Sequence, residues 1–168
     1  MEHHNNPLNL EAYAHFWVEK SRFHINFHFQ GKTHTHTKFS QTGYDNWGLW
    51  EYDVLELFLT RNHSHYLELQ ISPLKQTFAL LVIEPRKTYE KIERLDLAFQ
   101  VEHSANLFRV CADLAVSDIP GSSQHIQGNV HACLGPSDKR CFLGTNINSE
   151  EKVNFHRPDL FIPLGAIA

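Results

Sequence analysis

The sequence predicts an all-β protein, a two-sheet antiparallel β-sandwich with a jelly-roll-like arrangement of strands. Three observations predict it. Short runs of alternating apolar and polar residues recur along the chain and are separated by turn residues. No segment keeps the apolar period of 3.6 residues that an amphipathic helix needs. Aromatic residues, which favour strands, make up 12% of the 168 residues. This length predicts a single domain over residues 1–168.

The expected strands follow in order along the chain. Residues 23–29 alternate Phe and Ile with His and Asn, so one face is apolar. Further strands are expected at 53–60, 66–72, 78–83, 95–101, 108–112, 128–134, 140–144 and 160–164. The residues expected in the core are Phe23, Ile25, Phe27, Leu55, Leu57, Leu69 and Val110. Residues 8–15 are the best candidate for a helix.

Charge and cysteine usage argue against several classes of protein. A net charge of −4 disfavours binding of nucleic acid through its phosphates. No stretch approaches the roughly 18 consecutive apolar residues of a membrane span. The three cysteines are odd in number and lack Cys-x-x-Cys spacing, so we expect free thiols. Because the N-terminus also lacks the pattern of a signal peptide, we expect a cytoplasmic protein, with export of a processed chain as the alternative.

The best-defined candidate site lies on the hairpin formed by residues 53–60 and 66–72. Its expected register pairs Glu56 with Gln70, and the leucines alternate to the opposite face. Trp50 falls on the polar face as well if the first strand extends back that far. The residues expected to share this face are Trp50, Glu56, Tyr66, Glu68 and Gln70. An aromatic ring beside carboxylate and amide groups suits a sugar, and the alternative is an ordinary solvated sheet face.

Histidine is frequent in the chain, with 13 residues. His34 and His36 have the His-x-His spacing that lets two side chains on one strand reach the same metal ion, and so do His63 and His65. Both pairs lie in polar connections, where histidine is commonly solvated, and no third ligand stands out. We therefore expect no metal or other cofactor, with a His-bound metal as the alternative.

Motifs for catalysis are not found in the sequence. It contains no Gly-x-Ser-x-Gly elbow, no recognisable catalytic cysteine and no glycine-rich phosphate loop. Glu56 with Glu68, or Asp113 with Asp118, could be a pair of glycosidase carboxylates, but two acids on an exposed sheet are commonplace. The sequence therefore favours a protein that binds rather than catalyses.

Four stretches, in the correct order, resemble the family-9 carbohydrate-binding modules and the related DOMON-like β-sandwiches. Residues 49–59 (LWEYDVLELFL) place a Trp ahead of a strand that ends in Glu-apolar-Phe-apolar. Residues 66–73 look like the aromatic-x-Glu strand that ends in Ser-Pro. Residues 128–130 resemble the Asn-bearing penultimate strand, and residues 154–161 resemble the closing motif of stand-alone bacterial DOMON-like proteins. The resemblance covers about residues 10–164.

This resemblance implies a non-catalytic, sugar-binding sandwich in which two aromatic rings clamp a terminal sugar unit. Trp50 corresponds to one ring and Glu56 to an acid that contacts the sugar. The closing motif supplies the other side, where Phe155 and His156 stand in place of a second Trp. The residues expected to bind a mono- or oligosaccharide are Trp50, Glu56, Tyr66, Glu68, Gln70, Asn129, Phe155, His156 and Arg157.

Two alternative functions remain open at this point. Some DOMON relatives bind haem b through Met and His or Lys, which makes them electron-transfer proteins. Met1 is the only methionine in the chain, so a haem here would need histidine ligands. The second alternative is a structural or interaction domain without a small ligand. The sequence identifies no protein partner.

Overall fold

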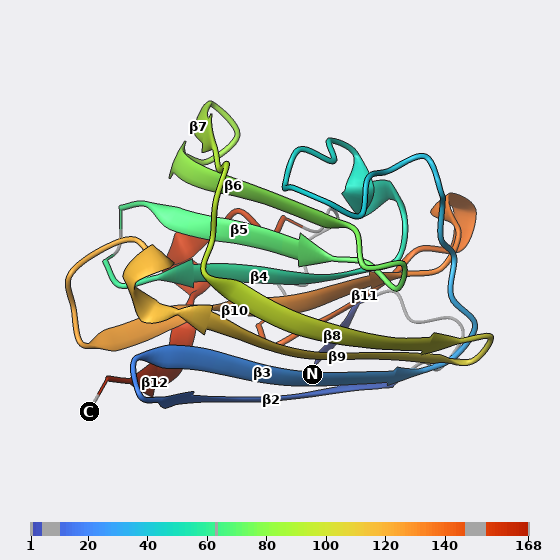
Figure 1. Cartoon of the computed structure of the whole chain (residues 1–168), viewed down its shortest axis with the longest axis horizontal. Coiled ribbons are helices and arrows are strands. Elements are labelled where there is room, and N and C mark those ends of the chain that lie inside the picture. The colour runs from blue at the N-terminus through green and yellow to red at the C-terminus, as the bar shows by residue number, and fades with distance from the viewer. Residues whose placement is uncertain (1, 5–10, 63, 147–153, 168) are drawn as a thin grey trace.

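The computed structural model of the chain describes residues 2–4, 11–62, 64–146 and 154–167, with side chains described from residue 11 onwards. Two antiparallel sheets pack face to face, which confirms the predicted β-sandwich (Figure 1). Across the described residues, no helix is long and apolar enough to cross a membrane.

The larger sheet contains eight of the described strands, in the order β1-β11-β10-β4-β5-β6-β7, with β12 also paired to β10. These strands are β1 (Glu2–His4), β4 (Val54–Thr60), β5 (Tyr66–Ile71), β6 (Thr77–Glu84), β7 (Thr88–Lys91), β10 (His125–Leu134), β11 (Cys141–Gly144) and β12 (Ile162–Ala166). Along β10, the backbone of β4 approaches very closely. A Cβ atom at Gly128 would lie 1.9 Å from the carbonyl oxygen of Phe58, so this position requires glycine.

The smaller sheet has four described strands in the order β2-β3-β9-β8. They are β2 (Ala12–Glu19), β3 (Arg22–Gln30), β8 (Leu97–Ser104) and β9 (Leu107–Ala115). Four short 3-10 helices connect the described strands: η1 (Leu49–Glu51), η2 (Val116–Asp118), η3 (Ser137–Lys139) and η4 (Pro158–Leu160). Every strand expected from the sequence is present, with ends shifted by a few residues, and β1, β2 and β7 were not expected.

The expected helix at residues 8–15 is wrong, since residues 12–15 belong to strand β2 and residues 8–10 lie outside the described part of the chain. Strand β2 pairs with β3 along its whole length, from Ala12 opposite Phe29 to Glu19 opposite Arg22. The physical reason is an alternation of period two. Its inward side chains are small or apolar and buried or half-buried, and its outward side chains are all exposed.

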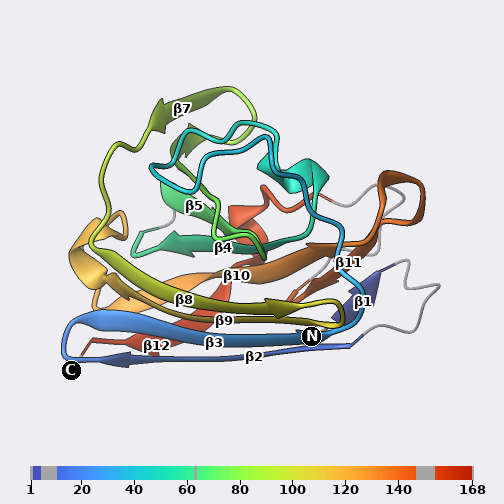
Figure 2. The ribbon, with the colours of Figure 1, turned by 45° about the vertical axis from the view of Figure 1, so that its right-hand side comes forward.

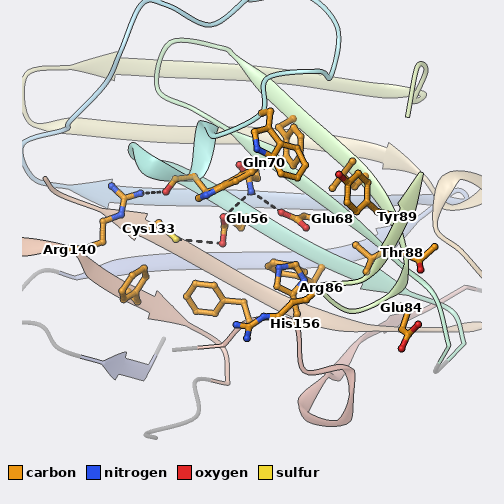
Figure 3. A pocket seen from close by; sticks show the side chains of 18 residues that line it. Glu56, Glu68, Gln70, Glu84, Arg86, Thr88, Tyr89, Cys133, Arg140 and His156 are labelled. Atoms are coloured by element: carbon orange, nitrogen blue, oxygen red, sulfur yellow. Dashed lines mark hydrogen bonds between the residues drawn. The ribbon is translucent and has the colours of Figure 1, made fainter. Parts of the chain in front are cut away.

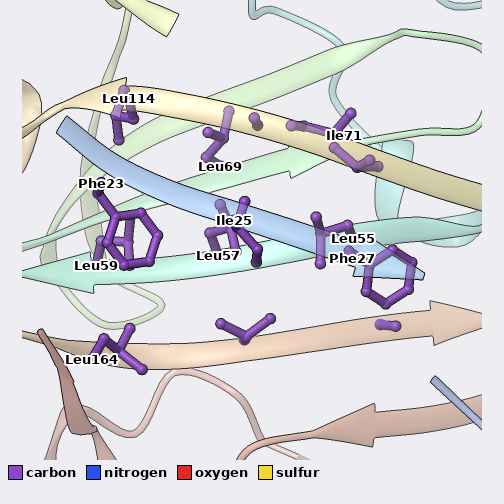
Figure 4. Packing of buried hydrophobic residues seen from close by; sticks show 14 of the residues in the cluster. Phe23, Ile25, Phe27, Leu55, Leu57, Leu59, Leu69, Ile71, Leu114 and Leu164 are labelled. Atoms are coloured by element: carbon purple, nitrogen blue, oxygen red, sulfur yellow. The ribbon is translucent and has the colours of Figure 1, made fainter. Parts of the chain in front are cut away.

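The core between the sheets is built mainly by the inward faces of β3, β4, β5 and β9 (Figure 4). Every residue expected there is at most 2% exposed: Phe23, Ile25, Phe27, Leu55, Leu57, Leu69 and Val110. Cys111 alternates with Val110 on β9 and is exposed, whereas Cys133 and Cys141 are buried, and all three cysteines are free.

Strands β4 and β5 are buried on both faces, because every residue of both strands is buried. Their second face packs in a smaller cluster that includes Phe58, Tyr66 and Phe78. In Figure 2 the connection before η1 and strand β7 lie on this side of β4 and β5, away from the smaller sheet. This second face is therefore covered by chain outside the sandwich core.

Leu57→Ala should destabilise the fold by about 2–5 kcal/mol, because it leaves a cavity in a core where Leu57 is 1% exposed. Urea denaturation followed by circular dichroism measures the free energy of unfolding. Leu107→Ala, at the half-buried start of β9, is the matched control and should cost less. Equal losses for the two variants would contradict the placement of Leu57 in the core.

Candidate functional site

A cavity of about 390 Å³ opens on the second face of the larger sheet (Figure 3). Strands β4, β5, β6 and β10 form its floor, and loops and the segment before η4 form its walls. We call it the outer cavity. Its lining residues are Trp47, Trp50, Glu56, Phe58, Glu68, Gln70, Phe78, Leu80, Val82, Glu84, Arg86, Thr88, Tyr89, Cys133, Arg140, Phe142, Phe155 and His156.

The floor carries a chain of hydrogen bonds between polar side chains of adjacent strands. Glu56 on β4 lies opposite Gln70 on β5, as the sequence predicts, and Glu68 lies two residues before Gln70. Gln70 Nε2 donates to Glu56 Oε1 at 3.0 Å and to Glu68 Oε1 at 2.8 Å. Cys133 Sγ donates to Glu56 Oε2 at 3.5 Å. The floor is therefore held rigidly by groups that are 1–5% exposed.

Hydrogen-bonding capacity is left over on this floor. The carbonyl oxygen of Gln70, Oε1, is buried and has no hydrogen-bond partner among the described residues. Such an atom costs free energy unless a bound molecule or water donates a hydrogen to it. Gln70 lines the cavity, so a bound molecule with hydrogen-bond donors can satisfy this oxygen.

Burial shifts the protonation of the floor carboxyls. It raises the pKa of Glu56 to about 7, against a smaller opposing effect of Arg140. Burial, together with a smaller contribution from the neighbouring Glu56, raises the pKa of Glu68 to about 8. Burial also raises the pKa of the Cys133 thiol, which therefore stays protonated and donates to Glu56. At neutral pH the floor thus holds a partly protonated pair of acids.

Arg140 positions the aromatic wall that contains Trp50. Its guanidinium donates to the carbonyl oxygen of Trp50 at 2.6 Å, to that of Tyr52, and to that of Gly135 at 2.7 Å. The same guanidinium lies 3.7 Å from buried Asp53. Because the carbonyls of Trp50 and Tyr52 lie at the end of η1, Arg140 fixes the turn that places Trp50 over the floor.

Four aromatic side chains form the first wall of the cavity. Trp47 and Trp50 meet with ring centroids 5.0 Å apart, and Trp50 lies 5.4 Å from Phe78. Tyr89 on β7 lies 5.6 Å from Trp47. Trp47 and Tyr89 are 54% and 48% exposed, so this wall presents open aromatic surface at the mouth of the cavity.

The second wall comes from β11 and the segment before η4. The rings of Phe142 and Phe155 lie 5.5 Å apart, and Phe155 rests on buried His131 at 4.1 Å. His156 Nδ1 is hydrogen-bonded to the hydroxyl of Tyr66 at 2.8 Å. Burial lowers the pKa of His156, so the ring is neutral near neutral pH. A flat molecule held between the two walls would meet rings on both sides.

The structure brings together six of the nine residues expected to bind a ligand: Trp50, Glu56, Glu68, Gln70, Phe155 and His156. Tyr66 lies behind His156 and does not line the cavity. Asn129 is 2% exposed and hydrogen-bonded to Thr145, and Arg157 pairs with Asp159 at 2.7 Å, so neither belongs to the lining.

Two assumptions behind the sequence prediction are wrong. Trp50 does not lie on an extended β4, because it belongs to η1 and the strand begins only at Val54. It reaches the cavity through the turn and not through strand parity. The polar face of the hairpin is also not a solvated surface, since Glu56, Glu68 and Gln70 are at most 5% exposed.

Sequence reasoning missed most of the walls. Trp47, Tyr89 and Arg86 come from irregular segments or from a short strand, where no periodicity predicts direction. Cys133 could have been found, because it follows His131 at strand spacing on β10 and so shares its face. Arg140 has no sequence signal of its own, and only its hydrogen bonds from the β10–β11 turn to the end of η1 reveal its role.

The described histidines of the two pairs do not form a metal site. In the described part of the chain, no group of three or more His, Cys, Asp or Glu side chains lies close enough to hold a metal ion. His34 and His36 instead pack on the ring of Tyr52, at 5.4 Å and 5.1 Å. His63 lies outside the described residues.

Comparisons with known sequences give one partial match. No protein-family model matches the chain. The UPF0462 protein C4orf33 homolog of Rattus norvegicus is 30% identical over 122 residues, which cover 68% of this chain. The chain spans 59% of the length of that relative, so the similarity involves a part of it.

Solved structures share the fold. A candidate carbohydrate-binding protein from Bacteroides uniformis matches with a TM-score of 0.72 over 98% of this chain and 81% of its own, at 11% identity. A family-9 carbohydrate-binding module from Caldicellulosiruptor kristjanssonii matches with a TM-score of 0.63 over 95% of this chain, at 13% identity. The chain covers 78% of that module in its glucose complex and 75% in its cellotriose complex. The fold is therefore like that of family-9 modules, and the likeness to DOMON proteins stays a prediction.

The raised pKa values of the floor carboxyls predict that the protein becomes less stable as pH rises. In the unfolded chain Glu56 and Glu68 ionise near 4.5, and in the folded protein near 7 and 8. The folded state therefore binds more protons in this range, and the free energy of unfolding falls as pH rises through it. Glu68→Gln should reduce the drop in Tm between about pH 5 and pH 8 by roughly 2–4 °C or more.

Glu102→Gln, an exposed carboxylate on the other sheet, is the matched control and should keep the wild-type pH profile. Burial lowers the pKa of His131 to about 3, which destabilises the fold on the acid side in both variants alike. Thermal unfolding across the pH range measures all three proteins. A Glu68→Gln profile that runs parallel to wild type would contradict the pKa shift of Glu68.

Proposed function

We propose that the outer cavity binds a carbohydrate and that the protein is a non-catalytic sugar-binding β-sandwich. The observation that carries the proposal is the floor, where Gln70 holds two buried carboxyls and keeps one unsatisfied carbonyl oxygen. A ligand that brings hydrogen-bond donors to this floor would satisfy that oxygen. Sugar hydroxyl groups are donors of this kind.

The aromatic walls of the cavity suit the apolar faces of a sugar ring. A pyranose has apolar C–H faces, which pack on aromatic rings, and a rim of hydroxyl groups. Trp50 and Phe78 stand on one side of the floor and Phe155 on the other, so both faces of a ring would be covered. A volume of about 390 Å³ lies within the usual range of small-molecule sites.

The structural comparisons support the same proposal. A family-9 module with this fold was solved in complex with glucose and with cellotriose. The protein from Bacteroides uniformis carries a description as a candidate carbohydrate-binding protein. Glucose and cellotriose are therefore the first probes to use. We expect affinities between micromolar and millimolar, because a small open site gains little beyond the lost hydration and freedom of the sugar.

Trp50→Ala should weaken sugar binding by roughly tenfold or more, because it removes one ring of the first wall. Isothermal titration calorimetry with glucose and cellotriose measures the change. Trp17→Ala is the matched control, since Trp17 lies on the smaller sheet and stacks on His24 at 4.9 Å. It should leave the affinity within about twofold of wild type.

Glu56→Gln should weaken binding less than Trp50→Ala, because the amide keeps one acceptor on the floor. Circular dichroism confirms that each variant is folded before titration. If a sugar binds and Trp50→Ala binds it as tightly as wild type does, the sugar site lies elsewhere. If no mono- or oligosaccharide binds the wild-type protein, the proposed function is wrong.

A further inference from the structure

When Glu68 is ionised, the open hydrogen-bonding positions on Glu68 and Gln70 are all acceptors. Gln70 Nε2 has two hydrogens, and both are used, one on Glu56 and one on Glu68. What remains is the carbonyl oxygen of Gln70, which is buried and without a partner among the described residues. The second carboxyl oxygen of Glu68 also accepts no hydrogen bond from the described part of the chain. These two acceptors belong to residues two apart on one strand, and both residues line the same cavity.

Glu68 has no basic partner among the side chains that the structure describes. Arg140 uses its guanidinium on three backbone carbonyls and lies beside buried Asp53, which carries the opposite charge. Arg86 lines the cavity from the exposed turn between β6 and β7, and its charge acts on Tyr66 and His156. The acid at the bottom of the cavity thus lacks a counter-charge, although it is only 5% exposed.

We propose that the sugar bound here is an amino sugar, whose ammonium group lies on the cavity floor against Glu68 and the carbonyl oxygen of Gln70. This inference rests on the proposed function. An ammonium group has three hydrogens to donate, so it can satisfy both open acceptors at once. A hydroxyl group at the same position has one hydrogen and leaves one acceptor unsatisfied.

The charge of the ammonium group adds to the match. A hydrogen bond between an ammonium and a carboxylate is roughly twice as strong as one between neutral groups. Burial alone raises the pKa of Glu68 and favours its protonated form, whereas an ammonium group beside it favours the carboxylate, so binding releases the Glu68 proton to solvent. Trp50 and Phe78 line the same cavity, and aromatic rings attract cations through their faces. These contributions favour the amine over a neutral hydroxyl.

Calorimetric titration at neutral pH with glucosamine, glucose and N-acetylglucosamine tests the inference. Glucose has a hydroxyl where glucosamine has the ammonium, and the acetyl derivative removes the charge. Glucosamine should bind about tenfold more tightly than glucose and than N-acetylglucosamine. Glu68→Gln should reduce this preference to about threefold or less, while the charge-matched control Glu102→Gln should keep it.

The outcomes separate the two proposals. If glucose binds as tightly as glucosamine, and Trp50→Ala weakens both, the sugar site is supported and the preference for an amine is wrong. If N-acetylglucosamine equals glucosamine, the charge is not the cause and the inference is overturned. If none of the three sugars binds, the inference of an amino sugar is overturned, and the cellotriose titration then decides the proposed function. The comparison of the three sugars uses the wild-type protein, so it holds even if Glu68→Gln does not fold.

Discussion

The pairing of β4 with β5 in a single register is the constraint on which the rest of the structure depends. Both strands are buried on both faces, so every side chain packs either in the sandwich core or on the covered second face. Their leucines face the sandwich core, and Glu56, Glu68 and Gln70 face the outer cavity. A slip of one residue would send the carboxyls into the apolar core and the leucines into the cavity. The core therefore fixes the register, and the register places the polar floor.

The buried polar side chains of the floor are tolerated because they hydrogen-bond to one another. An isolated carboxylate at this depth would be strongly unfavourable, and proteins respond by pairing such groups or by keeping them protonated. Both responses occur here. Gln70 donates to the two acids, and burial raises the pKa of each toward or above neutrality. Open acceptors remain on residues that line the cavity, and this property connects the energetics of the fold with the proposed ligand.

The walls come from parts of the chain that are distant in sequence. Trp47 and Trp50 stand at either side of the start of η1, Tyr89 lies on β7, and Phe155 follows the last gap in the described residues. Arg140 joins one of these regions to the turn between β10 and β11, because it donates to carbonyl oxygens at the end of η1. The proposed clamp for a sugar is thus assembled by long-range contacts and not by a local motif.

The sequence by itself determined the sandwich, the core residues and the pairing of Glu56 with Gln70. Period-two alternation is a local property that survives into the fold, because each strand must turn its apolar side to the same core. Alternation does not reveal which strands are covered on their second face, so the burial of the floor and its altered protonation required the tertiary structure. Alternation also does not predict where the side chains of turn residues point. The strand-parity argument for Trp50 is therefore wrong, and the sequence does not predict the roles of Trp47, Tyr89 and Arg140. The expected helix at residues 8–15 is wrong because the short alternation of β2 indicates a strand only when its pairing with β3 is known.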